Sequence, residues 1–559
     1  MCGIFCTFTE QNCSQCLLLE NHKLCCKAIN NRGPDFQRTI SLNVNDLHFI
    51  FAVSVLWLQG KNLTEQPVQT NNGTFMYNGD IFDYTKEICE FDPSESDTLT
   101  LMRFIESEGI YQALSVCNGP FSFIYLDTQS CKLHFGRDHF GRRSLLIGKL
   151  DNMFIITSSA KRKSNWEFIE LPPLGIFSYD INAKMFELTA WEKKSENFEQ
   201  KLKEVESFLN SNINLKDQHN EKQKINFRLP YKEELNIFEQ IKSKDFESNI
   251  RFLFSLEQWF SKVTLLERLL REAVRKRVHI QPKECSSCIF KKECHHALTG
   301  VLFSGGIDCA ILAFLCDKFS SKERPIDLIN VAFSKTNNYN TPDRETGLST
   351  LEELKELCPD RKWNFVEINI SEDKLNEKRN QVIADLIYPL NTVLDDSLGC
   401  ALWFAARGEN STYRSTCRVL LVGMGADELF GGYKKHRKAL KTEGWLGLFK
   451  SLEDDWQNLP HRNLARDDRV VSDHGRQLRT PYLDENVVNF VRNLNCWERT
   501  YPADDVLQGF GEKILLRCLA YKLGFRKAAF LKKRALQFGS RIANSKENAR
   551  DISPRLVLS

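Results

Sequence analysis

The most regular pattern in the chain is a short apolar run that ends in a glycine-rich turn. Residues 299–303 form one such run, and an apolar helical pattern follows its turn at 310–315. A second run, 418–422, ends in the glycine-rich segment 423–433. Short apolar runs bounded by turn signals are typical of buried strands. These segments therefore predict a parallel sheet with both turns beyond the carboxyl ends of its strands, where open parallel sheets bind their ligands.

The first of these turns has the form of an anion-binding loop. Its sequence is Ser304-Gly305-Gly306-Ile307-Asp308-Cys309. A strand, a glycine turn and a helix start expose backbone N–H groups and the positive end of the helix to whatever lies in the turn. The Gly-Lys-Ser/Thr ending of a Walker loop does not follow, which disfavours an NTPase that transfers a γ-phosphate. An ordinary strand turn is the alternative interpretation.

The middle of the chain differs in composition from both ends. Residues 193–249 are rich in Lys, Glu, Asn and Gln, contain no glycine and carry only scattered apolar residues. This composition is typical of charged helices or a solvated linker. Helical spacing of apolar residues resumes after position 264. We therefore expect a charged linker or insertion at 186–260 between two domains, and a disordered tail at 546–559.

A cysteine-rich segment lies just upstream of the anion loop. Cys285 and Cys288 are followed by Cys294, His295 and His296. Cysteine and histidine at such spacing suit Zn²⁺, with Cys285, Cys288, Cys294 and His295 as candidate ligands. The second half of the pattern is irregular, so reduced surface cysteines are the favoured alternative.

Composition narrows the function classes. The chain has 559 residues and is 42% apolar, enough to form the cores of two or three domains. A net charge of +3 with mixed signs gives no reason to expect nucleic acid or an anionic membrane as a partner. No apolar run approaches the ~18–20 residues of a membrane span, and the first residues do not look like a secretory signal. We expect a cytoplasmic protein whose 19 cysteines are mostly reduced.

The chain opens with Met1-Cys2-Gly3, so Cys2 becomes the first residue if the initiator methionine is removed. A terminal α-amino group has a pKa of ~7.7–8.0, far below the ~10.4 of lysine. Near neutral pH it can therefore accept the proton of a thiol on the same residue. The opening is compatible with an N-terminal nucleophile, and an ordinary processed terminus is the alternative.

Three further strings, together with this opening, resemble the class II glutamine amidotransferase family. They are residues 31–35, 77–82 and 135–142. The resemblance implies an α+β N-terminal-nucleophile sandwich with packed antiparallel sheets. It also implies that Cys2 attacks the side-chain amide of glutamine and releases ammonia, leaving a thioester that water hydrolyses.

The same resemblance implies how glutamine is held. Asn78 and the backbone N–H of Gly79 would stabilise the oxyanion, at roughly 2.7–4 kcal/mol per donor in comparable sites. Asp97 would bind the amino group of glutamine, and we add Asp80 and Arg32 to the glutamine-binding set. Without the other strings, Asn-Gly would be only a turn signal and Ser-Asp only a helix cap.

The second half resembles the asparagine synthetase family. The segment 423–433 carries this resemblance, and the strings 391–397, 466–469, 480–484 and 511–517 continue it. The two resemblances imply a first domain at 1–185 and a second at 261–545. The second resemblance implies an α/β parallel-sheet ATP pyrophosphatase domain that adenylates aspartate and amidates it to asparagine. Asp308 and Asp427 would face one magnesium ion, and two carboxylates suit such a hard cation. The ATP-binding residues implied are Phe303, Ser304, Gly305, Gly306, Asp308, Cys309, Phe333, Val422 and Gly423.

Several positions depart from these family patterns. The arginine that clamps the glutamine carboxylate falls on Val55, so either another cation such as Arg32 replaces it or glutamine binding is weakened or lost. A charge-assisted hydrogen bond is worth roughly 1.5–3 kcal/mol. Met424 stands where the family has a polar residue that serves the step after adenylation. Cys309 stands where serine is usual, and its thiol is a weaker hydrogen-bond donor than a hydroxyl. The late catalytic lysine aligns ambiguously across 532–534.

We therefore expect an amidotransferase with glutamine, aspartate and ATP as partners, and with ATP and magnesium as cofactors. Ammonia from the first site would reach the second through a protected passage between the domains. Two alternatives stay open. One is a catalytically degenerate protein that binds ATP or an amino acid for regulation, and the other is an enzyme that amidates a different carboxylate. Neither nucleic acid nor a membrane is expected as a partner, and a homodimer is left open.

Overall fold

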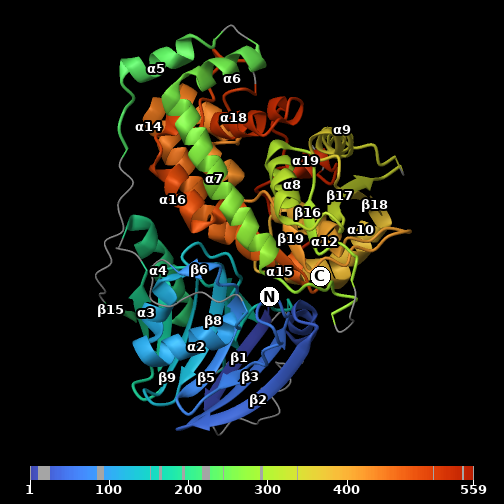
Figure 1. Ribbon diagram of the computed structural model, residues 1–559. Helices are drawn as coiled ribbons and strands as arrows, with labels where there is room; N and C mark the ends of the chain where they lie inside the picture. The colour runs from blue at the N-terminus through green and yellow to red at the C-terminus, as the bar shows by residue number, and fades with distance from the viewer. Residues whose placement is uncertain are drawn as a thin grey trace.

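Figure 1 shows the computed structural model, in which an N-terminal domain of packed sheets lies below a C-terminal α/β domain. The amino terminus lies at the junction of the two domains. The structure describes residues 2–10, 25–84, 94–150, 153–162, 166–191, 195–216, 227–242, 245–289, 294–336, 338–507, 509–543 and 547–557.

One layer of the N-terminal domain is an antiparallel sheet that contains the first residues of the chain. Its strand order within the described residues is β12-β10-β11-β1-β3-β2. The central position of β1 buries Cys2 and the strand that follows it. The strands are β1 (Cys2–Glu10), β2 (Phe36–Val44), β3 (Leu47–Val55), β10 (Leu146–Leu150), β11 (Met153–Thr157) and β12 (Glu167–Glu170).

The second layer is a sheet with the order β15-β14-β13-β9-β8-β5-β4, antiparallel except at β14–β15. Apolar side chains that alternate along the strands of both layers form the core between them. This arrangement is the α+β sandwich that the sequence predicted. Its strands are β4 (Val68–Gln69), β5 (Gly73–Gly79), β8 (Phe121–Asp127), β9 (Lys132–Arg137), β13 (Gly175–Asp180), β14 (Met185–Ala190) and β15 (Ile213–Lys216), and a separate small pair is β6 (Asp83–Tyr84) with β7 (Cys117–Asn118).

The outer face of the second sheet is covered by α2 (Asp97–Glu108) and α3 (Ile110–Ser115), whose apolar residues join a core of their own. The helix α4 (Glu196–Leu209) packs onto the core between the sheets and leads into β15. Its buried residues are spaced at helical intervals among charged ones: Phe198, Leu202, Val205 and Leu209. Residues 196–216 therefore extend the first domain, whereas the sequence placed them in a separate charged linker or insertion.

The second domain is built on a parallel sheet with the order β18-β17-β16-β19-β20. Alternate residues of its strands face α8 on one side and α12 on the other. The predicted runs 299–303 and 418–422 are its neighbouring strands β16 and β19, which confirms the predicted parallel sheet. The strands are β16 (Thr299–Leu302), β17 (Ile326–Ser334), β18 (Trp363–Ser371), β19 (Val419–Leu421) and β20 (Gln477–Arg479).

The long helix α7 (Glu257–His279) runs along the side of this domain and packs against α8, α16 and α18 (Figure 1). Among the described residues, none of the helices combines the length and apolar character that crossing a membrane requires. The other helices of the domain are α8 (Ile307–Phe319), α9 (Pro342–Leu357), α10 (Glu372–Lys378), α11 (Ala384–Ile387), α12 (Val393–Arg407), α13 (Ala426–Phe430), α14 (Lys434–Leu459), α15 (Ala465–Ser472), α16 (Glu485–Asn493), α17 (Cys496–Arg499), α18 (Ile514–Lys522) and α19 (Leu536–Gly539).

Two segments differ from the predicted boundaries of the second domain. The helices α5 (Lys232–Glu239) and α6 (Phe246–Ser255) contribute Phe238, Ile250 and Leu253 to its core, although the sequence placed them in the linker. Residues 547–557, predicted as part of a disordered tail, instead lie against α12. Arg555 forms an ion pair with Asp396 of that helix, whose buried charge accounts for the docking.

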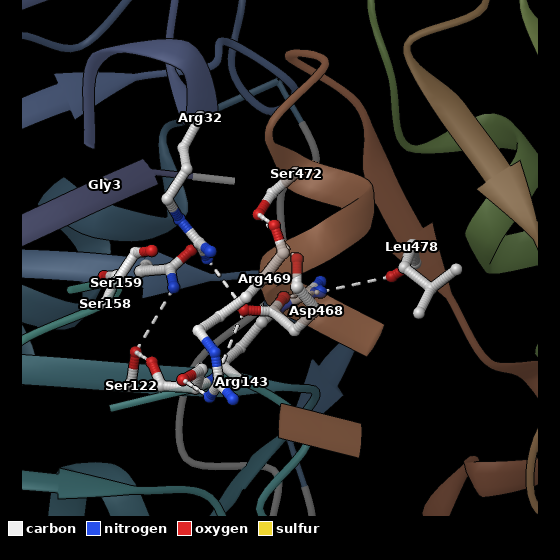
Figure 2. Close-up of polar contacts among 12 residues, drawn as sticks. Gly3, Arg32, Ser122, Arg143, Ser158, Ser159, Asp468, Arg469, Ser472 and Leu478 are labelled. Atoms are coloured by element: carbon white, nitrogen blue, oxygen red, sulfur yellow. Dashed lines mark hydrogen bonds and ion pairs between the residues drawn. The ribbon is translucent and has the colours of Figure 1, made fainter. Parts of the chain in front are cut away.

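The two domains are joined by buried ion pairs centred on Asp468 of α15 (Figure 2). Its carboxylate accepts hydrogen bonds from Arg32 at 2.7 Å, from Arg143 at 3.1 Å and from the backbone N–H of Ser144 at 3.2 Å. Burial alone would raise the pKa of Asp468, but Arg32 and Arg143 hold the pKa below its usual value. The pairs therefore stabilise the folded chain above about pH 4, and this contribution is lost in stronger acid.

Replacing Asp468 tests this junction. In Asp468→Ala, Arg32 and Arg143 lose their shared carboxylate while they stay buried. Breaking a buried ion pair from one side costs roughly 3–5 kcal/mol, and we expect the free energy of unfolding in urea to fall by about that much. Asp454→Ala, at an exposed position of α14, is the matched control and should change it by less than ~0.5 kcal/mol. Equal stability of the two variants would contradict this account.

Candidate functional site

Cys2 lies at the start of β1, opposite Val55 of β3 in the sheet register. Its backbone nitrogen donates to Asn78 Oδ1 at 2.9 Å, and Gln66 Nε2 lies 3.6 Å from its Sγ. The thiol is buried, and burial raises its pKa, whereas the positive chain terminus and a backbone N–H of Leu56 act in the opposite direction. The site therefore holds the sulfur in place and leaves its activation to a nearby base.

The predicted oxyanion residues lie at the end of β5, beside Cys2. The side-chain amide of Asn78 has two partners. Its Oδ1 accepts from the Cys2 nitrogen, and its Nδ2 donates to the Ser122 hydroxyl at 3.3 Å. Gly79 has no room for a side chain, because a Cβ at this position would lie 2.5 Å from the Pro120 carbonyl oxygen. The residue types at both positions thus follow from close packing around the thiol.

A cavity of about 30 Å³ adjoins Cys2. This volume is enough for water but not for an amino acid, so glutamine can enter only if the site opens. Its lining includes three predicted residues besides Cys2, namely Gly79, Asp80 and Asp97, and also Val55, Gln59, Gln66, Tyr77 and Thr98.

Asp97 has the charge properties of a site for a cation. It begins α2, and its Oδ1 accepts the backbone N–H of Thr98 at 2.7 Å. Its Oδ2 is buried and has no hydrogen-bond partner among the described residues. Burial, with the nearby Asp80 carboxylate, raises the pKa of Asp97 to about 7. An ammonium group in the cavity would give this oxygen a partner and favour its ionised form.

Arg32 and Asp80 serve the junction between the domains. Arg32 donates to the Cys2 carbonyl oxygen at 3.2 Å and to Asp468, and it does not belong to the lining of the cavity. Asp80 lines the cavity, yet its carboxylate pairs with Arg143 at 3.3 Å and with Arg479 at 3.0 Å. These contacts connect the back of the Cys2 site directly to the second domain.

The predicted anion loop lies at the carboxyl end of β16. Gly305 has a φ of 79°, and a Cβ there would lie 2.5 Å from the Gly347 nitrogen, so this turn requires glycine. Cys309 points its Sγ at the Gly306 carbonyl oxygen, 3.1 Å away, within the first turn of α8. The other predicted ATP-binding residues are placed at the carboxyl ends of three strands, with Phe303, Phe333 and Val422 buried and Ser304, Gly306 and Gly423 partly exposed.

Asp308 and Asp427 meet across this end of the sheet, as the sequence predicted from two separate loops. Lys513 joins them, since its Nζ lies 2.7 Å from a carboxylate oxygen of each aspartate. Lys533 forms a second ion pair with Asp427. Burial alone would raise the pKa of Asp427, but the two lysines hold this pKa well below its usual range. Asp427 is therefore held as an anion, and Lys513 places it beside Asp308.

This donor set fits a divalent cation such as Mg²⁺. Two carboxylates converge from two strand ends, and hard oxygen ligands of this kind are the ones that Mg²⁺ prefers. The space around them is kept by glycines, because a Cβ at Gly432 would lie 1.9 Å from Asp427 Oδ1 and one at Gly423 would lie 2.8 Å from the Asp308 Cβ. Lys513 and Lys533 add positive charge suited to phosphate oxygens.

The sequence assigned no role to Lys513 and did not single out Lys533. Lys513 occurs in a recognised string, but its charge becomes informative only where the fold brings α18 to the two aspartates. Lys533 was one of three candidates in an ambiguous alignment, and its contact with Asp427 singles it out geometrically. Met424 is half-buried and packs against the apolar clusters on both sides of the sheet, so it offers no polar group there.

Comparisons with known proteins agree with the division of the chain. Residues 1–223 match the family described as glutamine amidotransferase domain, and residues 296–455 match the family described as asparagine synthase. The asparagine synthetase domain-containing protein CG17486 of Drosophila melanogaster is 36% identical over 100% of both chains.

Two further relatives carry related names. Asparagine synthetase domain-containing protein 1 of Homo sapiens is 34% identical over 100% of this chain and 98% of its own. Protein YML096W of Saccharomyces cerevisiae, also named as an asparagine synthetase domain-containing protein, is 27% identical over 92% of this chain and 87% of its own. The chain belongs to the family of asparagine synthetase domain-containing proteins, in which a glutamine amidotransferase domain precedes an asparagine synthase domain.

Proposed function

We propose that the chain is a glutamine-dependent, ATP-consuming amide ligase that converts aspartate to asparagine. The observation that carries the proposal is the pair of carboxylates at the ends of β16 and β19, held together by Lys513 at 2.7 Å. Such a concentration of charge at the ligand-binding end of a parallel sheet suits a metal-bound nucleotide.

The first half-reaction would take place at Cys2. Once Met1 is removed, the freed α-amino group is the base nearest to the thiol, and Asn78 Oδ1 already holds the same nitrogen. The sulfur attacks the glutamine amide, the oxyanion receives hydrogen bonds from Asn78 and Gly79, and ammonia leaves. Water then cleaves the resulting thioester to give glutamate.

The second half-reaction would take place at the ends of β16 and β19. The residues that would hold Mg²⁺ are Asp308 and Asp427, and the ion would supply charge neutralisation for the phosphate oxygens. The loop around Gly305 and the two lysines would bind the pyrophosphate part of ATP. The aspartate carboxylate attacks the α-phosphorus, pyrophosphate leaves, and ammonia then displaces AMP to give the amide.

The residues at the junction support coupling of the two reactions. Arg32 connects Cys2 with Asp468, and Asp80 connects the cavity with Arg479 at the end of β20. Buried, charged contacts therefore reach from the Cys2 site to α15 and β20 of the second domain. Ammonia needs a protected passage across this junction, because it is protonated when it escapes into water.

A second candidate is a protein that keeps the fold and binds ATP but does not synthesise an amide. Val55 lines the cavity where the family has its carboxylate-binding arginine, and Met424 is apolar where the family has a proton-transferring group. Amidation of a different carboxylate is compatible with the same residues.

Synthesis from ammonia separates these candidates. With aspartate, MgATP and added ammonia, the purified protein should form asparagine and pyrophosphate in equal amounts. Asp308→Ala should abolish both products, whereas Asp360→Ala, at an exposed turn, should not. Cys2→Ala should keep the ammonia-dependent reaction and lose the glutamine-dependent one. ATP binding without either product would favour the second candidate or amidation of a different carboxylate.

Lys513 should be needed for the ATP reaction alone. Lys513→Ala leaves Asp308 and Asp427 in mutual repulsion and removes a charge from the phosphate site. Loss of one such preorganised group costs roughly 2.7–4 kcal/mol, so kcat for pyrophosphate formation should fall about 100-fold to 1,000-fold. Glutamine hydrolysis should be unchanged. Lys450→Ala, at an exposed position of α14, is the control, and equal activity of both variants would contradict this role.

Asp97 should make glutamine use dependent on pH. Its pKa of about 7 means that the carboxylate is mostly protonated below that pH, and only the ionised form pairs with the glutamine ammonium. In a glutaminase assay, KM for glutamine should therefore fall roughly tenfold between about pH 6 and about pH 8. Asp97→Asn should raise KM and remove this dependence, while Asp46→Asn, at an exposed turn, should change neither.

A further inference from the structure

A second cluster of chemically reactive side chains lies outside the two sites described above. It occupies the segment between α7 and β16, and its members are Cys285, Cys288, Cys294 and His296. One ligand atom from each residue lies within 4.8 Å of the others. The three cysteines are buried and the histidine is exposed. The structure corrects the predicted set in one position, since His296 and not His295 faces the sulfurs.

The distances in the cluster are those of a coordination shell. His296 Nδ1 lies 3.5 Å from Cys285 Sγ, 3.5 Å from Cys288 Sγ and 3.8 Å from Cys294 Sγ. Bonds of about 2.3 Å to sulfur and about 2.0–2.1 Å to nitrogen around tetrahedral zinc place the two kinds of atom about 3.5 Å apart.

Hydrogen bonding alone does not account for this arrangement. A ring nitrogen of neutral histidine carries at most one proton or one lone pair, so it can satisfy one sulfur and not three. Three thiols that surround one nitrogen therefore indicate a common partner at the centre. Three sulfurs and one imidazole nitrogen at tetrahedral spacing are a typical set for zinc.

The surrounding backbone supports the same interpretation. The Cys288 N–H donates to the Cys285 carbonyl oxygen at 3.0 Å, which closes the turn between these two ligands. The Cys285 N–H points at Cys294 Sγ, 3.5 Å away, as expected for a donor to a thiolate. Four protein ligands fill a tetrahedral shell and leave no position for a substrate, so the site is structural rather than catalytic.

We infer that Cys285, Cys288, Cys294 and His296 bind one Zn²⁺ ion that fixes the start of the parallel sheet. The ligand segment leads directly into β16, and Ser286 within it donates to the Thr416 carbonyl oxygen, just before β19. The ion thus ties together the beginnings of the two strands whose opposite ends carry Asp308 and Asp427. Its role is to hold these strands, and it takes no part in either half-reaction.

Metal analysis of the intact protein tests this site. We expect about one equivalent of zinc per chain, by inductively coupled plasma mass spectrometry, in protein purified without chelators or a metal-affinity tag. Replacement by Co²⁺ should give the visible absorption of a tetrahedral site and the near-ultraviolet thiolate-to-metal bands. The cobalt spectrum is measured on the natural sequence, so it does not depend on a variant that folds.

Variants then assign the ligands. Cys288→Ser and His296→Ala should each lose most of the zinc and lower the melting temperature. His295→Ala is the matched control, because it removes the neighbouring exposed histidine and should keep both. Retention of zinc in His296→Ala together with its loss in His295→Ala would overturn the ligand set. Protein with no bound zinc, reduced thiols and no cobalt spectrum would overturn the site itself, whatever the result of the activity assays.

Discussion

The two domains depend on the neutralisation of charge buried between them. Asp468 lies fully inside the protein and receives hydrogen bonds from two arginines and a backbone N–H of the first domain. One of these arginines, Arg32, also holds the carbonyl of Cys2. Because an unpaired buried charge is costly, the position of the N-terminal strand and the position of α15 are set by the same contacts. Arg32 therefore connects the first site to the contacts that dock the second domain.

The second site is built on the same principle of paired charges, but here the fold brings like charges together. Asp308 and Asp427 come from separate strand ends, and their repulsion is balanced by Lys513 and Lys533. The two lysines flank α18 and are distant in sequence from both aspartates. The four charges therefore come together only when the whole domain is folded. A cation at this point would share the carboxylates with the lysines, which leaves the lysines available for phosphate.

The sequence was sufficient to predict the features that depend on local pattern. The strand before Ser304, the glycine turn and the helix after it follow from residue type. The packed sheets of the first domain were implied by the resemblance of its strings to a known family. The sequence was not sufficient where contacts between distant parts of the chain decide the structure. The charged stretch around Phe198 was placed in a linker because its apolar residues are widely spaced, although they lie on one face of α4. The partner of Asp427 could not be chosen among adjacent basic residues, and the role of Arg32 at the junction has no local signal.

The energetic cost of both sites supports a function that uses them. Asp97 lines the cavity at Cys2 and keeps one carboxylate oxygen buried with no hydrogen-bond partner among the described residues, an arrangement that does not stabilise the fold. At the other site two aspartates converge on one lysine, and Lys513 and Lys533 are needed to balance their repulsion. Val55 and Met424 show that apolar side chains are accommodated at neighbouring positions of these same sites. A fold that only needed stability could accommodate apolar residues at Asp97 and Asp427 as well, and the charges that remain are those that the proposed reactions require.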